Sequence, residues 1–194
     1  MIRFALVLLV LAGTAAMLQA GDAYKETAFE MKIEGTSTLH DWTAPVGTMK
    51  AVADLTVADG GLKEVKAMWV QADVLSIKSE KGEDMDEKIY EALKTDKGHK
   101  TITFNLTSVK SITPSGSVSK VKAFGDVTIA GMKKSNVPML VTAEVLPNGD
   151  VVFKGSQKFT MTQYGMEIPS AMLGMITAGN DVTVKFSVTV RKSA

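Results

Sequence analysis

Apolar and polar residues alternate along several segments of this chain, and no other feature of the sequence constrains its fold as strongly. The clearest segment is the last one, DVTVKFSVTV, in which one face carries Val182, Val184, Phe186, Val188 and Val190. Successive side chains of a β-strand point to opposite faces of the sheet, so this period of two predicts a strand with one buried face. The chain is therefore expected to fold mainly from strands that pack one side against a core.

The same pattern, together with the turns that interrupt it, predicts about eight strands. The pair Asn148-Gly149 is typical of a tight hairpin turn and separates two of them. Antiparallel strands with one apolar face must pack in pairs or close on themselves, and eight strands can close into a barrel that holds side chains or one slim ligand. The expected strands lie near residues 24–36, 40–57, 62–77, 101–112, 117–130, 136–147, 150–163 and 180–191.

Two segments depart from the strand pattern. In EKGEDMDEKIYEALKT, charged residues surround an apolar face of Met85, Ile89 and Leu93 at helical spacing. We expect one short helix here, beginning at Glu83 or Asp84. The segment IPSAMLGMITAGN contains a proline and two glycines, so it predicts a loop with one helical turn rather than a long helix.

The first twenty residues, MIRFALVLLVLAGTAAMLQA, have the outline of a secretory signal peptide. Arg3 precedes an apolar run, and a tail of small residues follows that run. The run is too short to span a bilayer, which takes roughly 20 residues. We predict a signal peptide over residues 1–20, with cleavage after Ala20 or Ala16, and one mature domain over residues 21–194.

Composition narrows the class of protein and its compartment. The chain has 22 basic and 21 acidic residues and no cysteine. No basic stripe indicates a nucleic-acid partner. A signal peptide without later disulfides is typical of a bacterial periplasmic protein, so we expect a periplasmic or secreted location.

The run GTSTLHDW contains His40, one of two histidines, and Trp42, one of two tryptophans. A catalytic triad, a metal site and the lip of a pocket are the alternatives. No serine elbow motif accompanies His40 and Asp41, and two histidines are too few for a zinc signature. No phosphate-binding or dinucleotide motif occurs either. We therefore predict no catalytic residues, no metal and no cofactor, and His40 is either a pocket residue or a structural histidine.

Methionines crowd into one late segment, FTMTQYGMEIPSAMLGMI. Methionine is flexible and polarisable, which suits a surface that must fit a long apolar partner. Ordinary core packing beneath a loop explains the same residues equally well. As a ligand mouth, the segment offers Met161, Tyr164, Met166, Ile168, Met172, Leu173 and Met175.

The segment MWVQADVLSI is apolar on both of its expected faces. Met68 and Val70 lie on one face, and Trp69 lies on the other. A fully covered core strand accounts for this pattern, and so does a strand lined by ligand inside and covered by the helix outside. The sequence leaves both alternatives open.

Several of these segments, in this order, carry a family resemblance. They are TSTLHDW, AMWVQADVLSIKS, MDEKIYEALKTDKGHKTITF, FGDVTIAGMKKSNVPM, FTMTQYGMEIPS and DVTVKFSVTV. From about Ala23 to Arg191 the chain resembles the YceI-like family of secreted lipid- and polyisoprenoid-binding proteins. The resemblance implies an all-β fold: an antiparallel, eight-stranded, lipocalin-like barrel with one short helix and an elongated apolar interior cavity.

The resemblance also implies a function without catalysis. The expected ligand is a polyprenyl chain, an isoprenoid quinone or a fatty-acid derivative, which the protein would sequester or carry. A structural or stress-related envelope protein with a filled barrel is the first alternative, and an enzyme that acts on a lipid through His40 and Asp41 is the second. Transient contact with a membrane or membrane enzymes is expected, and the oligomeric state is left open, with a homodimer among the alternatives.

The expected ligand-binding residues follow from the motifs and the resemblance together. The glycine-bearing segment PSAMLGMITAG is the expected gate for ligand release. The ligand-binding set comprises His40, Trp42, Trp69, Phe104, Met161, Tyr164, Met166, Met172, Leu173 and Met175.

Overall fold

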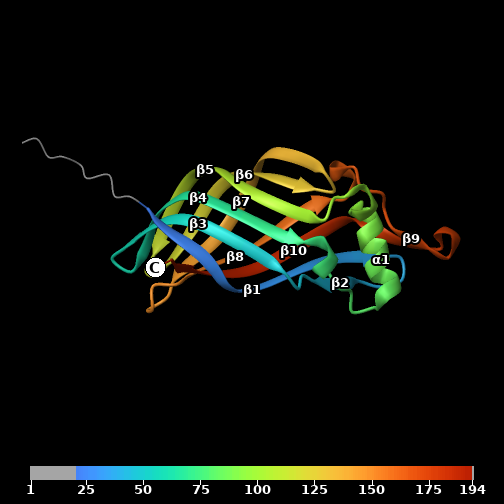
Figure 1. Cartoon of the computed structure of the whole chain (residues 1–194), viewed down its shortest axis with the longest axis horizontal. Coiled ribbons are helices and arrows are strands. Elements are labelled where there is room, and N and C mark those ends of the chain that lie inside the picture. Colours follow the sequence, from blue (N-terminus) through green and yellow to red (C-terminus); the bar gives the residue numbers. More distant parts are fainter. Residues whose placement is uncertain (1–20, 194) are drawn as a thin grey trace, which may run out of the picture.

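Eight long strands close into a barrel in the computed structural model, which describes residues 21–193 (Figure 1). The strand order is β1-β3-β4-β5-β6-β7-β8-β10, every neighbouring pair is antiparallel, and β10 pairs back onto β1. The predicted antiparallel, eight-stranded barrel is confirmed. The strands are β1 (Asp22–Ser37), β3 (Met49–Ala58), β4 (Gly61–Asp73), β5 (Thr101–Ser115), β6 (Val118–Ile129), β7 (Met132–Val145), β8 (Val151–Thr160) and β10 (Ile176–Lys192).

Two short strands are added at the edges, β2 (Trp42–Pro45) on β1 and β9 (Ser170–Ala171) on β10. The prediction of one strand over 40–57 is therefore wrong, because the chain breaks after Pro45. At the break, the Gly47 N–H donates to the Ser76 carbonyl at 2.9 Å instead of continuing a strand ladder. The predicted signal peptide over residues 1–20 lies outside the described residues.

Strand β4 also ends earlier than the predicted 77. The Asp73 carboxylate accepts a hydrogen bond from the Leu75 N–H at 3.0 Å and so starts a 3₁₀ turn over Val74–Ser76. A side chain that satisfies the backbone locally competes with the sheet ladder, which explains why the strand stops here.

The predicted buried face of the last strand is present. Val182, Val188 and Val190 are almost fully buried, and they meet inward residues of the other strands such as Leu55 and Val151. Val190, Leu55 and Val151 close the end of the barrel at which β10 finishes, whereas Val182 lies near the start of β10, toward the opposite end. The opposite end has more space, and the cavities described below extend toward it.

Helix α1 (Glu83–Ala92) lies across the second end of the barrel, near β2 (Figure 1). Its bounds agree with the predicted helix. The Tyr90 hydroxyl hydrogen-bonds to the carbonyls of Leu75 and Ile77, both at 3.0 Å, and Leu93 after the helix is buried. Over the described part of the chain, none of the helices has the length and apolar character needed to cross a membrane.

Pairing between β7 and β8 covers only part of their length. The ladder runs from Val145↔Val151 to Val141↔Gly155 and then stops. Residues 132–140 of β7 and 156–160 of β8 have no rungs between them, and we call this region the β7–β8 gap. The eight strands thus form a closed ring at one end of the barrel, whereas β7 and β8 separate from each other toward the opposite end.

Candidate ligand-binding cavity

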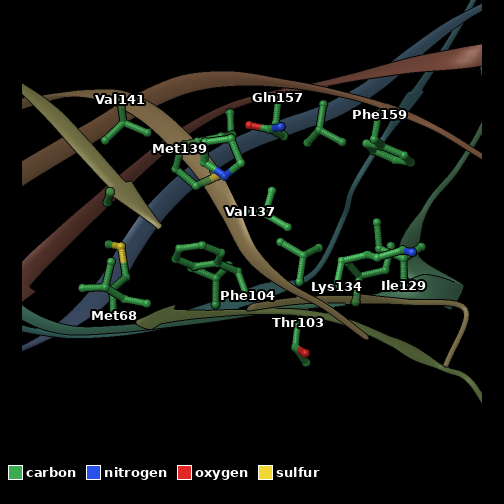
Figure 2. A pocket seen from close by; sticks show the side chains of 18 of the residues that line it. Met68, Thr103, Phe104, Ile129, Lys134, Val137, Met139, Val141, Gln157 and Phe159 are labelled. Atoms are coloured by element: carbon green, nitrogen blue, oxygen red, sulfur yellow. The ribbon is translucent and has the colours of Figure 1, made fainter. Parts of the chain in front are cut away.

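The barrel encloses a cavity of about 540 Å³ (Figure 2). This volume lies within the range of roughly 300–1,000 Å³ that is typical of small-molecule sites. The lining is mostly aliphatic, aromatic and methionine side chains that the strand alternation turns inward. They include Met68, Val70, Phe104, Leu106, Val127, Met139, Val141, Phe153 and Phe186.

A second cavity of about 260 Å³ lies between the barrel and helix α1. Trp42, Ile89, Met161 and Met166 contribute to its lining. The two cavities adjoin, so the barrel has an elongated apolar interior, as predicted. Four residues line both cavities: Ile102, Ile129, Phe159 and Val184.

Polar residues of the larger cavity gather along the β7–β8 gap. Lys134, Ser135 and Asn136 come from β7, and Gln157 and Lys158 come from β8. No aspartate or glutamate is among the described residues that line either cavity. The larger cavity therefore has an apolar body with a polar side opening at this gap, where the lining lysines carry positive charge, and Lys81 and Lys88 line the smaller cavity.

Six of the expected ligand-binding residues line these cavities. Phe104 and Tyr164 line the larger cavity, whereas His40, Trp42, Met161 and Met166 line the smaller one. Contact between these residues and a ligand stays a prediction.

Tyr164 and His40 occupy very different surroundings. Tyr164 is buried and packs edge-on against Phe159 with ring centroids 5.5 Å apart. Burial raises the pKa of the Tyr164 phenol, so the hydroxyl stays protonated at neutral pH. His40 is exposed at the rim of the smaller cavity, where its Nδ1 lies 3.1 Å from the Asp41 carbonyl oxygen.

The other four expected residues do not line either cavity, and their contact with a ligand also stays a prediction. Trp69 alternates with Met68 and Val70, which face the cavity, so its side chain belongs to the outer face of β4. Met172 and Leu173 form a projecting turn in which both have positive φ, and Leu173 is fully exposed.

Met175 follows this turn and is also exposed. The ends of the segment do reach the smaller cavity, through Ala171 and Ile176. The predicted loop with one helical turn is present as a 3₁₀ turn over Met172–Gly174. Its apolar tip points away from the cavity, because both flanks are fixed to the barrel by backbone hydrogen bonds from Ala178 to Pro169 and from Thr38 to Thr177.

Sequence reasoning missed the residues of the β7–β8 gap and the role of Gly125. A Cβ atom at Gly125 would lie 2.2 Å from Cε2 of Phe104, so the glycine makes room for the Phe104 ring to lie over β6. An isolated glycine inside a strand pattern is a signal of such close approach. That signal was present in the sequence, in FGDVTIAG.

A glycine also explains the tryptophan of GTSTLHDW. Gly35 of β1 pairs directly with Trp42 of β2, and a Cβ at Gly35 would lie 2.3 Å from Cζ2 of the indole. The indole N–H donates to the Thr36 carbonyl at 3.0 Å. The motif therefore holds an aromatic ring against the backbone at the wall of the smaller cavity.

Substituting Gly35→Ala is expected to displace the Trp42 ring, to shift its fluorescence to longer wavelength and to destabilise the fold by about 1–3 kcal/mol, as overpacking does. The measurement uses a Trp69→Phe background, because the chain has two tryptophans. Gly61→Ala is the matched control, since the nearest atoms to a Cβ there lie at 3.9 Å. Unchanged emission in Gly35→Ala would contradict this account of the motif.

Between residues 21 and 193, no three side chains of the histidine, cysteine, aspartate or glutamate type cluster closely enough to hold a metal ion. The expectation that the protein needs no metal or cofactor stays a prediction. The Ser37 hydroxyl donates to the His40 carbonyl at 2.7 Å, so this nearby hydroxyl is engaged with backbone rather than with the imidazole.

The fold and the cavity define a lipocalin-like antiparallel barrel with an elongated apolar interior. The YceI-like domain matches residues 46–190, and the chain therefore belongs to the YceI-like family. No curated protein matches the sequence significantly.

Solved structures share this fold at low sequence identity. A polyisoprenoid binding domain from Saccharophagus degradans superposes with a TM-score of 0.66 at 11% identity, over 90% of this chain and 100% of that one. BcnA from Burkholderia cenocepacia gives 0.59 at 16% identity, over 83% and 95%. A YceI protein from Campylobacter jejuni gives 0.58 at 19% identity, over 77% and 85%.

Proposed function

We propose that this protein binds a long-chain isoprenoid or other lipid amphiphile inside its barrel, and sequesters or carries it in the periplasm without catalysis. The observation that carries the proposal is the apolar cavity of about 540 Å³ that adjoins a second cavity of about 260 Å³. The shared fold with a polyisoprenoid binding domain supports the same ligand class. Ligands of that class include polyprenyl chains, isoprenoid quinones and fatty-acid derivatives.

Burial of the tail supplies the affinity. Each methylene withdrawn from water contributes about 0.8 kcal/mol, so a tail that fills the cavity binds tightly with few polar contacts. Affinity is therefore expected to follow tail length more closely than head-group chemistry. The methionines of the lining, such as Met68 and Met139, can adjust to tails of different shape.

The cavity volume favours this function over a structural protein whose barrel is filled by its own side chains. The surroundings of His40 favour it over an enzyme acting on lipid. His40 is exposed at the rim, and the hydroxyl of Ser37, the serine of this motif, donates to the His40 backbone carbonyl. A nucleophile and its base need a direct hydrogen bond between their side chains.

The test is mass spectrometry of the organic extract from protein purified out of its native cells, beside a sample stripped with detergent. The expected result is one prenyl or acyl species in near-equal amount to protein. The intact mass reports the predicted cleavage before Gly21 in the same experiment. An empty extract, together with no uptake of offered polyprenols, quinones and fatty acids by the stripped protein, would overturn the proposal.

A further inference from the structure

The β7–β8 gap is a polar side of the larger, mostly apolar cavity, and its shape comes from a bulge in β7. Val137 pairs with Gly125 of β6, whereas Lys134 pairs with Val127. Two residues of β7, Ser135 and Asn136, therefore stand opposite one residue of β6. Asn136 has a φ of 61°, a left-handed conformation that asparagine tolerates better than most residues.

The bulge turns a lysine toward the cavity. Residues directly opposite in an antiparallel pair share a face of the sheet, and Val127 lines the cavity. Lys134 is therefore on the inner face, and Figure 2 shows it at the same end of the view as Ile129 and Phe159. Without the bulge, the alternation of Val137 and Met139 would have placed Lys133 inward instead.

The two neighbouring lysines differ in their charge partners. Lys133 Nζ contacts the Asp126 carboxylate at 2.5 Å, and this contact lowers the pKa of Asp126. Among the described residues, Lys134 has no carboxylate within salt-bridge distance, and neither has Lys158 across the gap. Within residues 21–193, no acidic residue lines the cavity on either side of the gap. A positive charge at the edge of an apolar cavity favours an anion as its partner.

We propose that the cavity selects amphiphiles with an anionic head group, a phosphate ester or a carboxylate, and that Lys134 binds this head in the β7–β8 gap while the tail fills the barrel. The proposal rests on the proposed function and adds the chemistry of the head. Asn136 and Gln157 stand beside Lys134 with side-chain amides that suit the same oxygens, whereas the Ser135 side chain hydrogen-bonds to the Asp126 carboxylate. Lys134 is exposed to solvent, so the expected preference is about tenfold rather than larger.

The experiment measures dissociation constants of the stripped protein for matched ligands, by displacement of a fluorescent probe. One pair is a polyprenyl phosphate and the polyprenol of the same length, and the other is a fatty acid and its fatty alcohol. The expected result is about tenfold tighter binding of the charged member, decreasing as salt is raised. Preference in only the first or only the second pair also supports the proposal and names the source of the anion.

Variant proteins assign the preference to one residue. Lys134→Met is expected to abolish the preference while it keeps alcohol binding, and Lys133→Met, the control one residue away, is expected to retain it. Lys134→Gln repeats the test with a polar side chain should the methionine variant fail to fold. Equal binding of charged and uncharged members by the unmodified protein would overturn this inference and leave the proposed function standing. If the unmodified protein bound neither the charged nor the uncharged member of either pair, the proposed function itself would be overturned.

Discussion

Replacing Ala123 with tryptophan is expected to abolish tight binding of long tails while the barrel stays folded. Ala123 of β6 is buried and lines the larger cavity, between Val109 of β5 and Met139 of β7. The indole would occupy the space of about four methylenes, which removes about 3 kcal/mol and weakens binding roughly hundredfold. The large void should accept the ring with less strain than a packed core would.

The matched control is Lys122→Trp, one position earlier on the same strand. Lys122 is exposed on the outer face and pairs with Ser111 and Leu140. The Lys122→Trp variant adds the same side chain outside the cavity. Its dissociation constant for a long-tailed ligand should therefore equal that of the unmodified protein. Circular dichroism of both variants reports the fold. If Ala123→Trp binds a long tail with unchanged affinity and stoichiometry, the ligand lies elsewhere in the molecule.

The second large effect concerns the ion pair that ties the last strand to the β7–β8 hairpin. Asp150 is buried beside the Asn148-Gly149 turn, and its two carboxylate oxygens accept hydrogen bonds from Arg191 at 2.9 and 2.8 Å. Asn148 donates a third at 3.0 Å. Removing one partner of such a pair leaves the other without its hydrogen bonds, so Asp150→Asn is expected to lower the Tm by several degrees at neutral pH.

The same pair sets a dependence on pH. The hydrogen bonds from Arg191 lower the pKa of Asp150 in the folded protein. A carboxyl with a lowered folded pKa stabilises the protein fully above its unfolded pKa, near 3.9, and this stability is lost as the pH falls through the folded value. The Tm of the unmodified protein should therefore fall more steeply below about pH 4 than that of Asp150→Asn.

Thermal melts between pH 2 and pH 7 check this expectation. Asp59→Asn serves as control, because Asp59 is exposed and its contact with Lys63 is a surface pair at 3.4 Å. Such pairs contribute little to stability. Parallel acid profiles for Asp150→Asn and the unmodified protein would show that the Arg191 pair does not set the acid sensitivity.

Alternation in the sequence predicts most of the fold because the barrel has one apolar face almost everywhere. The inward set of the last strand, the Asn148-Gly149 hairpin and helix α1 are present as expected. The break after Pro45 was not predictable from the pattern, because Val46 continues the apolar alternation and is buried although it belongs to no strand. The strand ends there because the backbone N–H groups of Gly47 and Thr48 donate hydrogen bonds to Ser76, which is distant in sequence.

The site was harder to predict because local composition does not fix which face a residue occupies. Trp69 and Met68 are both apolar, and only the register of β4 in the closed barrel sends one outward and the other inward. Met172 and Leu173 look like core residues by hydropathy, yet the fixed flanks of their turn project them into solvent. Lys134 was missed because it precedes the strand expected near 136–147, and because the bulge shifts the phase of β7 by one residue.

Where two strands of a sheet part, each presents a row of backbone donors and acceptors that a strand from another protein could complete. Residues 132–140 and 156–160 form two such rows, separated by the β7–β8 gap. Pro138 interrupts the first row because it has no N–H to donate, and Lys133 and Lys158 place charge beside both rows. These residues discourage association of the parted strands with a strand from another protein.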